Sequence, residues 1–243
     1  HVPHFEKMLY DNAQLVSLYS KAYTLTKDPW YKTVVTNTLN FIETELTRDN
    51  GSFYSSLDAD SLNTEGKLEE GAFYVWTKAE LKSLLNEDYP LFEAYYNINE
   101  YGHWEHNNYV LIRTKSNSEI ANDFSIPIST LDKKLTSWKA LLNNNRQKRA
   151  QPRLDDKSLT SWNALMINGY IDAYKAFQIN DYLEIALKAS NFILDKMLQK
   201  DGSLTHSYNK NEAKINGYLE DYAFTIEAFI SLFVIIIIEK SFE

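Results

Sequence analysis

The residues best suited to chemistry in this 243-residue sequence are carboxylates, which occur in close pairs far apart along the chain. Asp58 and Asp60 lie in one loop, whereas Glu220 and Asp221 lie near the last predicted helix. Two carboxyl groups that face one another can act as acid and base, or as acid and nucleophile, on a glycosidic bond. His4 adds a candidate base for proton transfer, as an epimerase would need. We therefore predict that these five residues are catalytic.

Other polar and aromatic residues are candidates for binding a substrate. Tryptophan rings stack on sugar faces, and carboxylates and amides hydrogen-bond to hydroxyl groups. The alternative is that the acidic residues only stabilise the N-terminal ends of helices through the helix dipole, and that the aromatic residues only pack in the core. The predicted binding residues are Glu6, Asp11, Glu70, Trp76, Trp104, Asp155, Asp156, Trp162 and Asn163.

Two clusters resemble metal sites superficially. Counted from Asp58, an EF-hand loop would need an oxygen ligand where Leu62 stands and a glycine where Asn63 stands. His103 and His106 lie three residues apart between turn-like segments, and no third ligand is evident. The sequence also has no phosphate loop, dinucleotide fingerprint or serine nucleophile elbow. We predict neither a metal nor a cofactor.

Long helices must position these residues, because the chain has only seven glycines and five prolines for turns. Residues 12–56 align without a gap with residues 163–207, and the identical pairs include Gly51 with Gly202. Each copy has the pattern of a helix, a break, a second helix and a glycine turn. The sequence thus predicts an all-α fold that contains two copies of a helical hairpin.

Such hairpins bury their apolar faces by stacking on neighbours, in either an open superhelix or a closed ring. In both arrangements, the segments that lead into the first helix of each hairpin meet at one end of the stack. We therefore expect the separate carboxylate pairs to surround one hollow.

Composition and charge exclude several function classes. The net charge of −8 disfavours broad electrostatic binding to nucleic acid or to an anionic membrane surface. The absence of cysteine excludes disulfides and thiol catalysis within this sequence. No targeting signal is visible, and the apolar run 228–238 is shorter than the about 20 residues of a membrane-spanning helix. Residence in the cytoplasm is the default expectation.

Four segments, taken in order, resemble one family. They are HVPHFEKMLYDNA at residues 1–13, LDADS at 57–61 with EGAFYVWT at 70–77, PRLDDK at 152–157 with TSWN at 160–163, and GYLEDYAF at 217–224. On these segments the sequence is similar to the thioredoxin-domain-containing proteins that include the spermatogenesis-associated member. It departs from them at residues 62–69, which leaves Glu65 and Glu70 as alternatives for the glutamate of a Glu-Gly pair.

The resemblance implies an α/α toroid similar to N-acylglucosamine 2-epimerases and six-hairpin glycosidases, with the four segments lining its cleft. It also implies that a thioredoxin-like domain and the last helices of the ring lie outside this sequence, so we expect a fragment of a longer polypeptide. Residues 1–243 would then form a single, incomplete toroid domain.

The leading functional hypothesis is a carbohydrate-active or carbohydrate-binding toroid, acting as a glycoside hydrolase or a sugar epimerase on a small-molecule or oligosaccharide ligand. The alternative is a non-catalytic module that partners or regulates a thioredoxin-like domain. We expect no nucleic-acid or membrane partner. Because an unfinished ring would expose the apolar run 228–238, we also expect self-association into a homo-oligomer.

Overall fold

The computed structural model describes residues 4–240, and most of these residues lie in helices. The expectation of a mainly helical fold is confirmed, and the structure adds short strand pairs between the helices. The described chain divides into two compact units. The first unit comprises the described residues up to Glu6 and Asp58–Arg153, and the second comprises Lys7–Leu57 and the described residues from Leu154 onward. A single domain over residues 1–243 stays a prediction.

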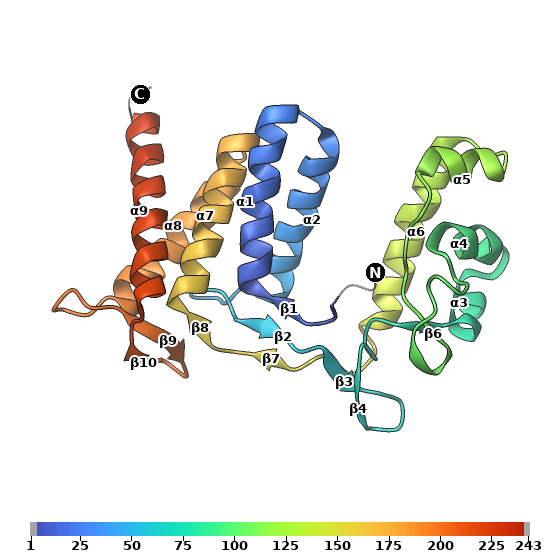
Figure 1. Ribbon diagram of the computed structural model, residues 1–243, viewed down its shortest axis with the longest axis horizontal. Coiled ribbons are helices and arrows are strands. Elements are labelled where there is room, and N and C mark those ends of the chain that lie inside the picture. Colours follow the sequence, from blue (N-terminus) through green and yellow to red (C-terminus); the bar gives the residue numbers. More distant parts are fainter. Residues whose placement is uncertain (1–3, 241–243) are drawn as a thin grey trace. The chain divides into compact units, whose positions relative to one another are not determined.

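The second unit is a row of helices with short strands at one end (Figure 1). Its elements are β1 (Lys7–Met8), α1 (Leu9–Thr26), α2 (Pro29–Glu45), β2 (Ser56–Leu57), β7 (Leu154–Asp155), β8 (Ser158–Leu159), α7 (Thr160–Phe177), α8 (Asn180–Phe192), a π-helical turn (Ile193–Met197), β9 (Thr205–Asn209), β10 (Glu212–Asn216) and α9 (Leu219–Lys240). Helix α1 packs against α2 and α7, and α7 packs against α8 and α9. The buried residues of these helices form one core.

Both copies of the sequence repeat are helical hairpins with the same internal geometry. The bounds of α1 recur 151 residues later as the bounds of α7. Lys27 and Gln178, which follow these two helices, both have left-handed backbones, with φ of 59° and 55°. Gly51 and Gly202 turn the chain after the second helices with φ of 90° and 85°, a conformation that glycine adopts without a steric penalty.

The strand register repeats as well. Strand β1 pairs with β2 through Lys7 and Leu57, and β8 pairs with β9 through the equivalent residues Ser158 and Tyr208. Strand β7 then lies on the other side of β2 as β10 lies beside β9. Helix α7 begins six residues after Leu154 of β7, and α9 begins six residues after Ala213 of β10.

A hydrogen bond between neighbouring copies shows that α9 begins a third copy. The amide oxygen of Asn163 in α7 accepts a bond from the backbone N–H of Phe53 at 2.8 Å. The hydroxyl oxygen of Tyr222 in α9 accepts one from Leu204, the residue equivalent to Phe53, at 3.0 Å. Helix α9 therefore stands to the second copy as α7 stands to the first.

Helix α9 leaves an apolar stripe exposed. Ile226, Ile230 and Phe233 are 58%, 60% and 64% exposed, whereas Ala228 and Leu232 are buried. In α7 the residues equivalent to the stripe are Ile167, Ile171 and Tyr174, and all three are buried. Self-association through this stripe stays a prediction. No helix in the described part of the chain is both long enough and apolar enough to cross a membrane.

The first unit has its own helices and cores. Its regular elements are β3 (Asp60–Leu62), β4 (Leu68–Glu70), β5 (Trp76–Thr77), α3 (Lys78–Leu85), a 3-10 turn (Asn86–Asp88), α4 (Tyr89–Tyr96), a second such turn (Glu105–Asn107), β6 (Asn108–Tyr109), α5 (Asn117–Asp123) and α6 (Ile128–Arg146). Thr77 and Glu80 form a capping box that starts α3, as their spacing indicates. Helices α3, α4 and α6 bury a core around Phe92, Leu131 and Trp138.

Candidate functional site

Several predicted site residues lie at the strand end of the second unit. Strands β1, β8 and β10 lead into α1, α7 and α9, so the first turns of these three helices lie at that end (Figure 1). The predicted residues in those first turns are Asp11, Trp162, Asn163, Glu220 and Asp221. The strands supply backbone partners there, and one of these residues has an unusual set of contacts.

Asp221 is fully buried, with 0% of its surface exposed. One carboxylate oxygen, Oδ1, accepts a hydrogen bond from the N–H of Ser161 at 2.9 Å. The other, Oδ2, accepts one from the N–H of Tyr218 at 2.8 Å and lies 2.9 Å from Nδ1 of His206. The free-energy cost of burying a carboxylate is offset when hydrogen-bond donors of the protein take the place of water. Asp221 is therefore held rigidly, and its predicted catalytic role stays a prediction.

His206, on β9, is the functional candidate that the sequence prediction missed. Its side chain is 17% exposed, and its ring meets the ring of Tyr218 edge-on at 4.7 Å. Because Oδ2 of Asp221 accepts, Nδ1 of a neutral imidazole carries the proton and donates it. Nε2 is then left as the basic nitrogen. No hydrogen bond to Nε2 is found among the described residues. This pairing orients an imidazole for proton transfer.

The repeat scaffold does not require this pair. Where the first copy meets the second, Ser55 takes the place of His206 and Trp162, in α7, takes the place of Asp221. Ser55 donates to the backbone oxygen of Lys157 instead, at 2.8 Å. The aligned copies thus contained the signal that was missed: a serine in one and a histidine in the other, one residue before an identical serine.

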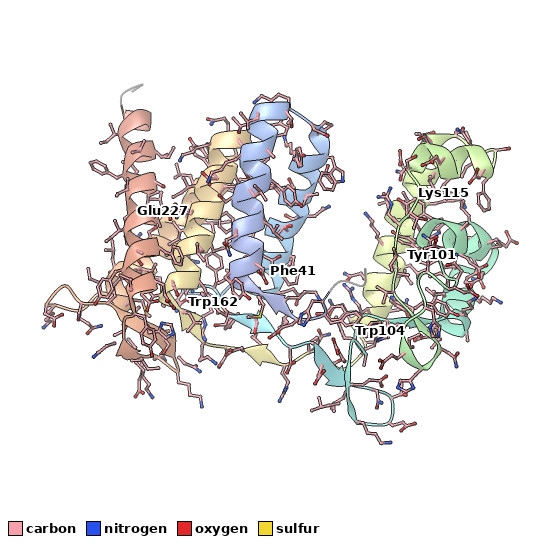
Figure 2. All side chains as sticks on the ribbon, viewed as in Figure 1. Phe41, Tyr101, Trp104, Lys115, Trp162 and Glu227 are labelled. Carbon is pink, nitrogen blue, oxygen red and sulfur yellow. The ribbon has the colours of Figure 1, made fainter. Side chains whose placement is uncertain are left out.

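Trp162 supplies a half-buried aromatic surface beside Ser161, whose N–H binds Asp221. Its ring lies 4.8 Å from that of Tyr10, at an angle of 59°. Figure 2 shows Trp162 at the strand end of α7. A half-buried ring can stack on a sugar, and this role of Trp162 stays a prediction.

Asn163 has a structural role, and its predicted role in substrate binding stays a prediction. Its side chain is 1% exposed. Its amide nitrogen donates to the backbone oxygens of Phe53 and Leu159, while its amide oxygen accepts from the N–H of Phe53. With both polar atoms engaged in the interior, this amide fastens α7 to the preceding copy and is not presented to a ligand.

The other predicted acids of the second unit lie nearer the surface. Asp155 pairs with Lys157 at 2.8 Å, and the exposed side chain of Asp156 accepts from the amide of Asn209 at 2.9 Å. Glu220 and Asp11 are exposed in the first turns of their helices, where the positive end of the helix dipole favours a carboxylate. These positions leave the acids available to solvent or to a polar ligand.

Asp58, in the first unit, is held as an ion pair. Its Oδ2 accepts from Nε of Arg153 at 2.9 Å, and its Oδ1 accepts from the N–H of Asp60 at 3.2 Å. The bond from Asp60 and the Arg153 guanidinium keep the pKa of Asp58 below its ordinary value. A general acid needs a raised pKa, so of the two predicted roles Asp58 suits the ionised base or nucleophile better than the proton donor.

The remaining predicted residues of the first unit differ in their solvent exposure and contacts. Asp60 and Glu70 lie opposite one another on β3 and β4, and His4 is exposed. Trp104 packs edge-on against Phe5 at 5.3 Å. Glu6 is half-buried, and the first residues of the family motif, including His1, lie outside the described part of the chain.

Trp76 is almost fully buried, and its predicted role in stacking on a sugar stays a prediction. It is 3% exposed, and the guanidinium of Arg149 lies 4.0 Å from the centre of its ring. The same Arg149 donates to the backbone oxygens of Phe73 and Val75. The ring face that could have met a sugar is therefore covered by a side chain of its own unit.

The predicted residues thus fall into two sets, one in each unit, and a hollow shared by Asp58, Asp155 and Glu220 stays a prediction. Among the described residues, no three histidine or carboxylate side chains are grouped closely enough to hold a metal ion.

Comparison with known proteins assigns the chain's relatives. No family model matches the chain. It is 34% identical over 262 residues to the Caenorhabditis elegans protein B0495.5, covering 96% of this chain and 36% of that protein. It is 32% identical over 266 residues to human spermatogenesis-associated protein 20, covering 96% of this chain and 33% of that protein. The chain is a homologue of spermatogenesis-associated protein 20. The resemblance inferred from the four segments is confirmed.

The chain spans about a third of the length of spermatogenesis-associated protein 20. Among solved structures, it is similar to cellobiose 2-epimerase from Spirochaeta thermophila, with 14% identity, a TM-score of 0.30, and coverage of 96% of this chain and 72% of that chain.

Proposed function

We propose that this homologue of spermatogenesis-associated protein 20 is a sugar-active protein whose second unit carries out proton transfer, as a sugar epimerase does. The observation that supports this proposal is the contact between His206 and the fully buried Asp221. A carboxylate that fixes Nδ1 as the protonated nitrogen leaves Nε2 to remove a proton from a substrate carbon or hydroxyl. Glycoside hydrolysis is the second candidate: it needs two facing carboxyl groups, one protonated and one ionised, and Asp58, whose pKa is lowered, suits only the ionised one.

A sugar suits the surroundings of the pair. Trp162 adjoins Ser161, whose N–H binds Asp221, and offers a half-buried ring for stacking. Exposed Glu220 lies next to Asp221 along α9 and can accept hydrogen bonds from hydroxyl groups. Proton transfer beside a carbonyl needs one base at hydrogen-bond distance, and His206 can supply it.

The test is exchange of hydrogen for deuterium at C2 of reducing sugars in heavy water, followed by NMR. We expect at least one aldose or disaccharide of a panel to exchange. His206→Gln should lower the exchange rate by about 10²- to 10⁴-fold, because general-base catalysis contributes about that factor. Asp221→Asn should also lower it, since the amide can donate to Nδ1 and reverse the tautomer.

His103→Gln is the matched control, because His103 is exposed and lies in the first unit. Its exchange rate should equal that of the unmodified chain. Undiminished exchange in a folded His206→Gln variant would overturn the proposal. Absence of exchange with every sugar, combined with selective binding to a thioredoxin-like domain, would instead favour the non-catalytic module.

A further inference from the structure

We infer that Tyr218 determines the substrate specificity of the His206 site, because its ring lies where a second ring of the substrate would stack. The inference rests on the proposed function: the reducing sugar that loses a proton to His206 carries a further ring, with an apolar face, at its far end. A second pyranose and an aromatic group share this chemistry, since each presents a flat apolar face to a tyrosine ring.

Tyr218 lies directly beside the proton-transfer pair. Its backbone N–H donates to Oδ2 of Asp221 at 2.8 Å, and the centre of its ring lies 4.7 Å from that of the His206 ring, at an angle of 65°. Tyr218 is 53% exposed, whereas the side chain of His206 is 17% exposed. A sugar in contact with Nε2 of His206 would therefore have the open ring of Tyr218 as its neighbour.

The scaffold does not need an aromatic residue at this position. Tyr218 directly precedes α9, as Met8 precedes α1 and Leu159 precedes α7. Neither Met8 nor Leu159 has a ring, and both are half-buried. The ring of Tyr218 is thus not required by the repeated turn, and its half-exposed surface is available to a ligand.

Ile215 places a second exposed apolar side chain near the pair. The residue pairs on either side of it in β9 and β10 put Ile215 opposite His206. Its backbone is left-handed, with φ of 64°, which is rare for a β-branched residue. Because its side chain is 57% exposed, burial of that side chain does not offset the strain. Strained residues cluster at ligand sites, so Ile215 supports a binding role for the surface around His206.

A substrate with two rings would use this surface better than a monosaccharide. A single sugar at Nε2 of His206 would leave the apolar surface of Tyr218 and Ile215 in water, whereas a further ring would cover part of it. Covering apolar surface favours binding in proportion to its area. Binding energy from such a remote ring can also orient the reacting carbon, which raises kcat/KM.

The test compares three reducing sugars: glucose, maltose, which adds a second pyranose at O4, and 4,6-O-benzylidene-glucose, which adds an aromatic ring. Exchange at C2 in heavy water gives kcat/KM, and titration calorimetry gives the Kd of each sugar. At least one of the two extended sugars should bind and exchange about three- to tenfold better than glucose, as for one added ring contact. Which of them is preferred distinguishes a second sugar from an aromatic group.

Tyr218→Leu copies Leu159 of the equivalent turn, so it removes the ring and keeps an apolar side chain that the turn accepts. It should lower kcat/KM for the preferred extended sugar by about three- to tenfold and that for glucose by less than about twofold. Tyr218→Phe should keep the preference. The backbone N–H that binds Asp221 is present in both variants, so the pH profile of exchange should not change. Tyr101→Leu, at a tyrosine of the first unit that is 77% exposed, is the matched control.

Ile215→Gly separates binding from folding. Glycine adopts a left-handed backbone without strain, so this variant should unfold at a higher denaturant concentration than the unmodified chain. The same variant should prefer the extended sugar less, because it lacks the apolar side chain opposite His206. A merely structural role of Ile215 would not combine a more stable fold with a weaker preference.

The outcomes distinguish this inference from the proposed function. Exchange at equal kcat/KM for all three sugars, or an undiminished preference in a folded Tyr218→Leu variant, would overturn the inference and leave proton transfer by His206 standing. Binding of an extended sugar that depends on Tyr218, without any exchange, would support the inference and overturn proton transfer. If none of the three sugars binds or exchanges, the inference is overturned, and the wider panel of sugars decides the proposed function.

Discussion

The two copies of the hairpin repeat differ most in what joins their strands. In the first copy, Asp58–Arg153 stands between β2 and β7. In the second copy, β9 and β10 are joined through Lys210 and Asn211 alone. The strands nevertheless pair in the same register, with Leu57 opposite Leu154 and Tyr208 opposite Ala213. The register therefore comes from the hairpins, and the first unit is an insertion at a turn that the scaffold can make with two residues.

The comparison also separates scaffold from chemistry. The left-handed residues after the first helices, the glycine turns and the bond from one copy to the next all recur. The residues at the His206 and Asp221 positions do not recur. Backbone geometry is thus shared by the copies, while the proton-transfer pair lies where the second copy meets α9.

The largest expected effect concerns the bond between copies. Asn163→Ala should lower the free energy of unfolding by about 3 kcal/mol, because it leaves a buried N–H and a buried oxygen of Phe53 without partners. Tyr222→Phe removes a single acceptor at the equivalent place and should cost about 1 kcal/mol. Asn12→Ala is the control, because Asn12 bonds only within its own copy, to Met8. Guanidinium denaturation measures the free energy of unfolding of all three variants. A loss in Asn12→Ala as large as that in Asn163→Ala would contradict the role of the bond between copies.

The next effect concerns close packing of helices. A Cβ at Gly169 would lie 3.0 Å from the backbone oxygen of Ala13 in α1 and 3.1 Å from the side chain of Met166. Gly169→Val should therefore destabilise the chain by about 2 kcal/mol through overpacking. Leu18, the equivalent residue in α1, is 58% exposed, and Leu18→Val should change stability by less than about 0.5 kcal/mol. Thermal unfolding followed by circular dichroism checks both.

A pH effect should arise in the inserted unit. Burial disfavours the charged form of Asp88, but bonds from Lys134 and Trp138 outweigh it and lower its pKa below the ordinary 3.8. Because the folded pKa is depressed, this stabilisation is present above about pH 4 and is lost as the pH falls through the folded value. Asp88→Asn should cost about 1 kcal/mol at pH 7, allowing for partial solvent screening, and should flatten the loss of stability between about pH 5 and 3.

Denaturation at several pH values tests this. Asn144→Ala is the control, because Asn144 is an exposed residue of the same helix, α6, as Lys134 and Trp138, and its amide does not titrate. An unchanged pH slope in Asp88→Asn would rule out the assignment.

The smallest effect is a gain at the short turn. Lys210 and Asn211 have φ of 48° and 64°, and the sequence Asn-Gly suits two such residues best. Replacing them together, Lys210→Asn with Asn211→Gly, should raise the free energy of unfolding by about 0.5 kcal/mol. Denaturation midpoints measure it, and a loss of stability would show that the two strands are not joined by this kind of turn.

Much of the second unit was predictable because its signals are local. Helical spacing, the glycine turns and the constant offset between copies are written in consecutive residues, as Gly51 and Gly202 show. The two-residue strands of the second unit were missed, because pairings such as Lys7 with Leu57 leave no alternation to detect.

The site was predicted less completely. Asp221 was chosen for its charge, but its burial and its three partners depend on contacts between β9, α7 and α9. His206 was passed over because a lone histidine in a strand carries no motif. For Asn163 and Trp76, residue type does not reveal that a backbone group bonds to the first and that an arginine lies against the second.

The ends of the inserted unit are tied together. The backbone N–H of Asp58 donates to the backbone oxygen of Arg153 at 2.9 Å, and the two side chains form an ion pair. The first and last residues of the insertion therefore lie next to each other. A cassette closed in this way can lengthen, shrink or be exchanged during evolution while its host keeps the same strand partners.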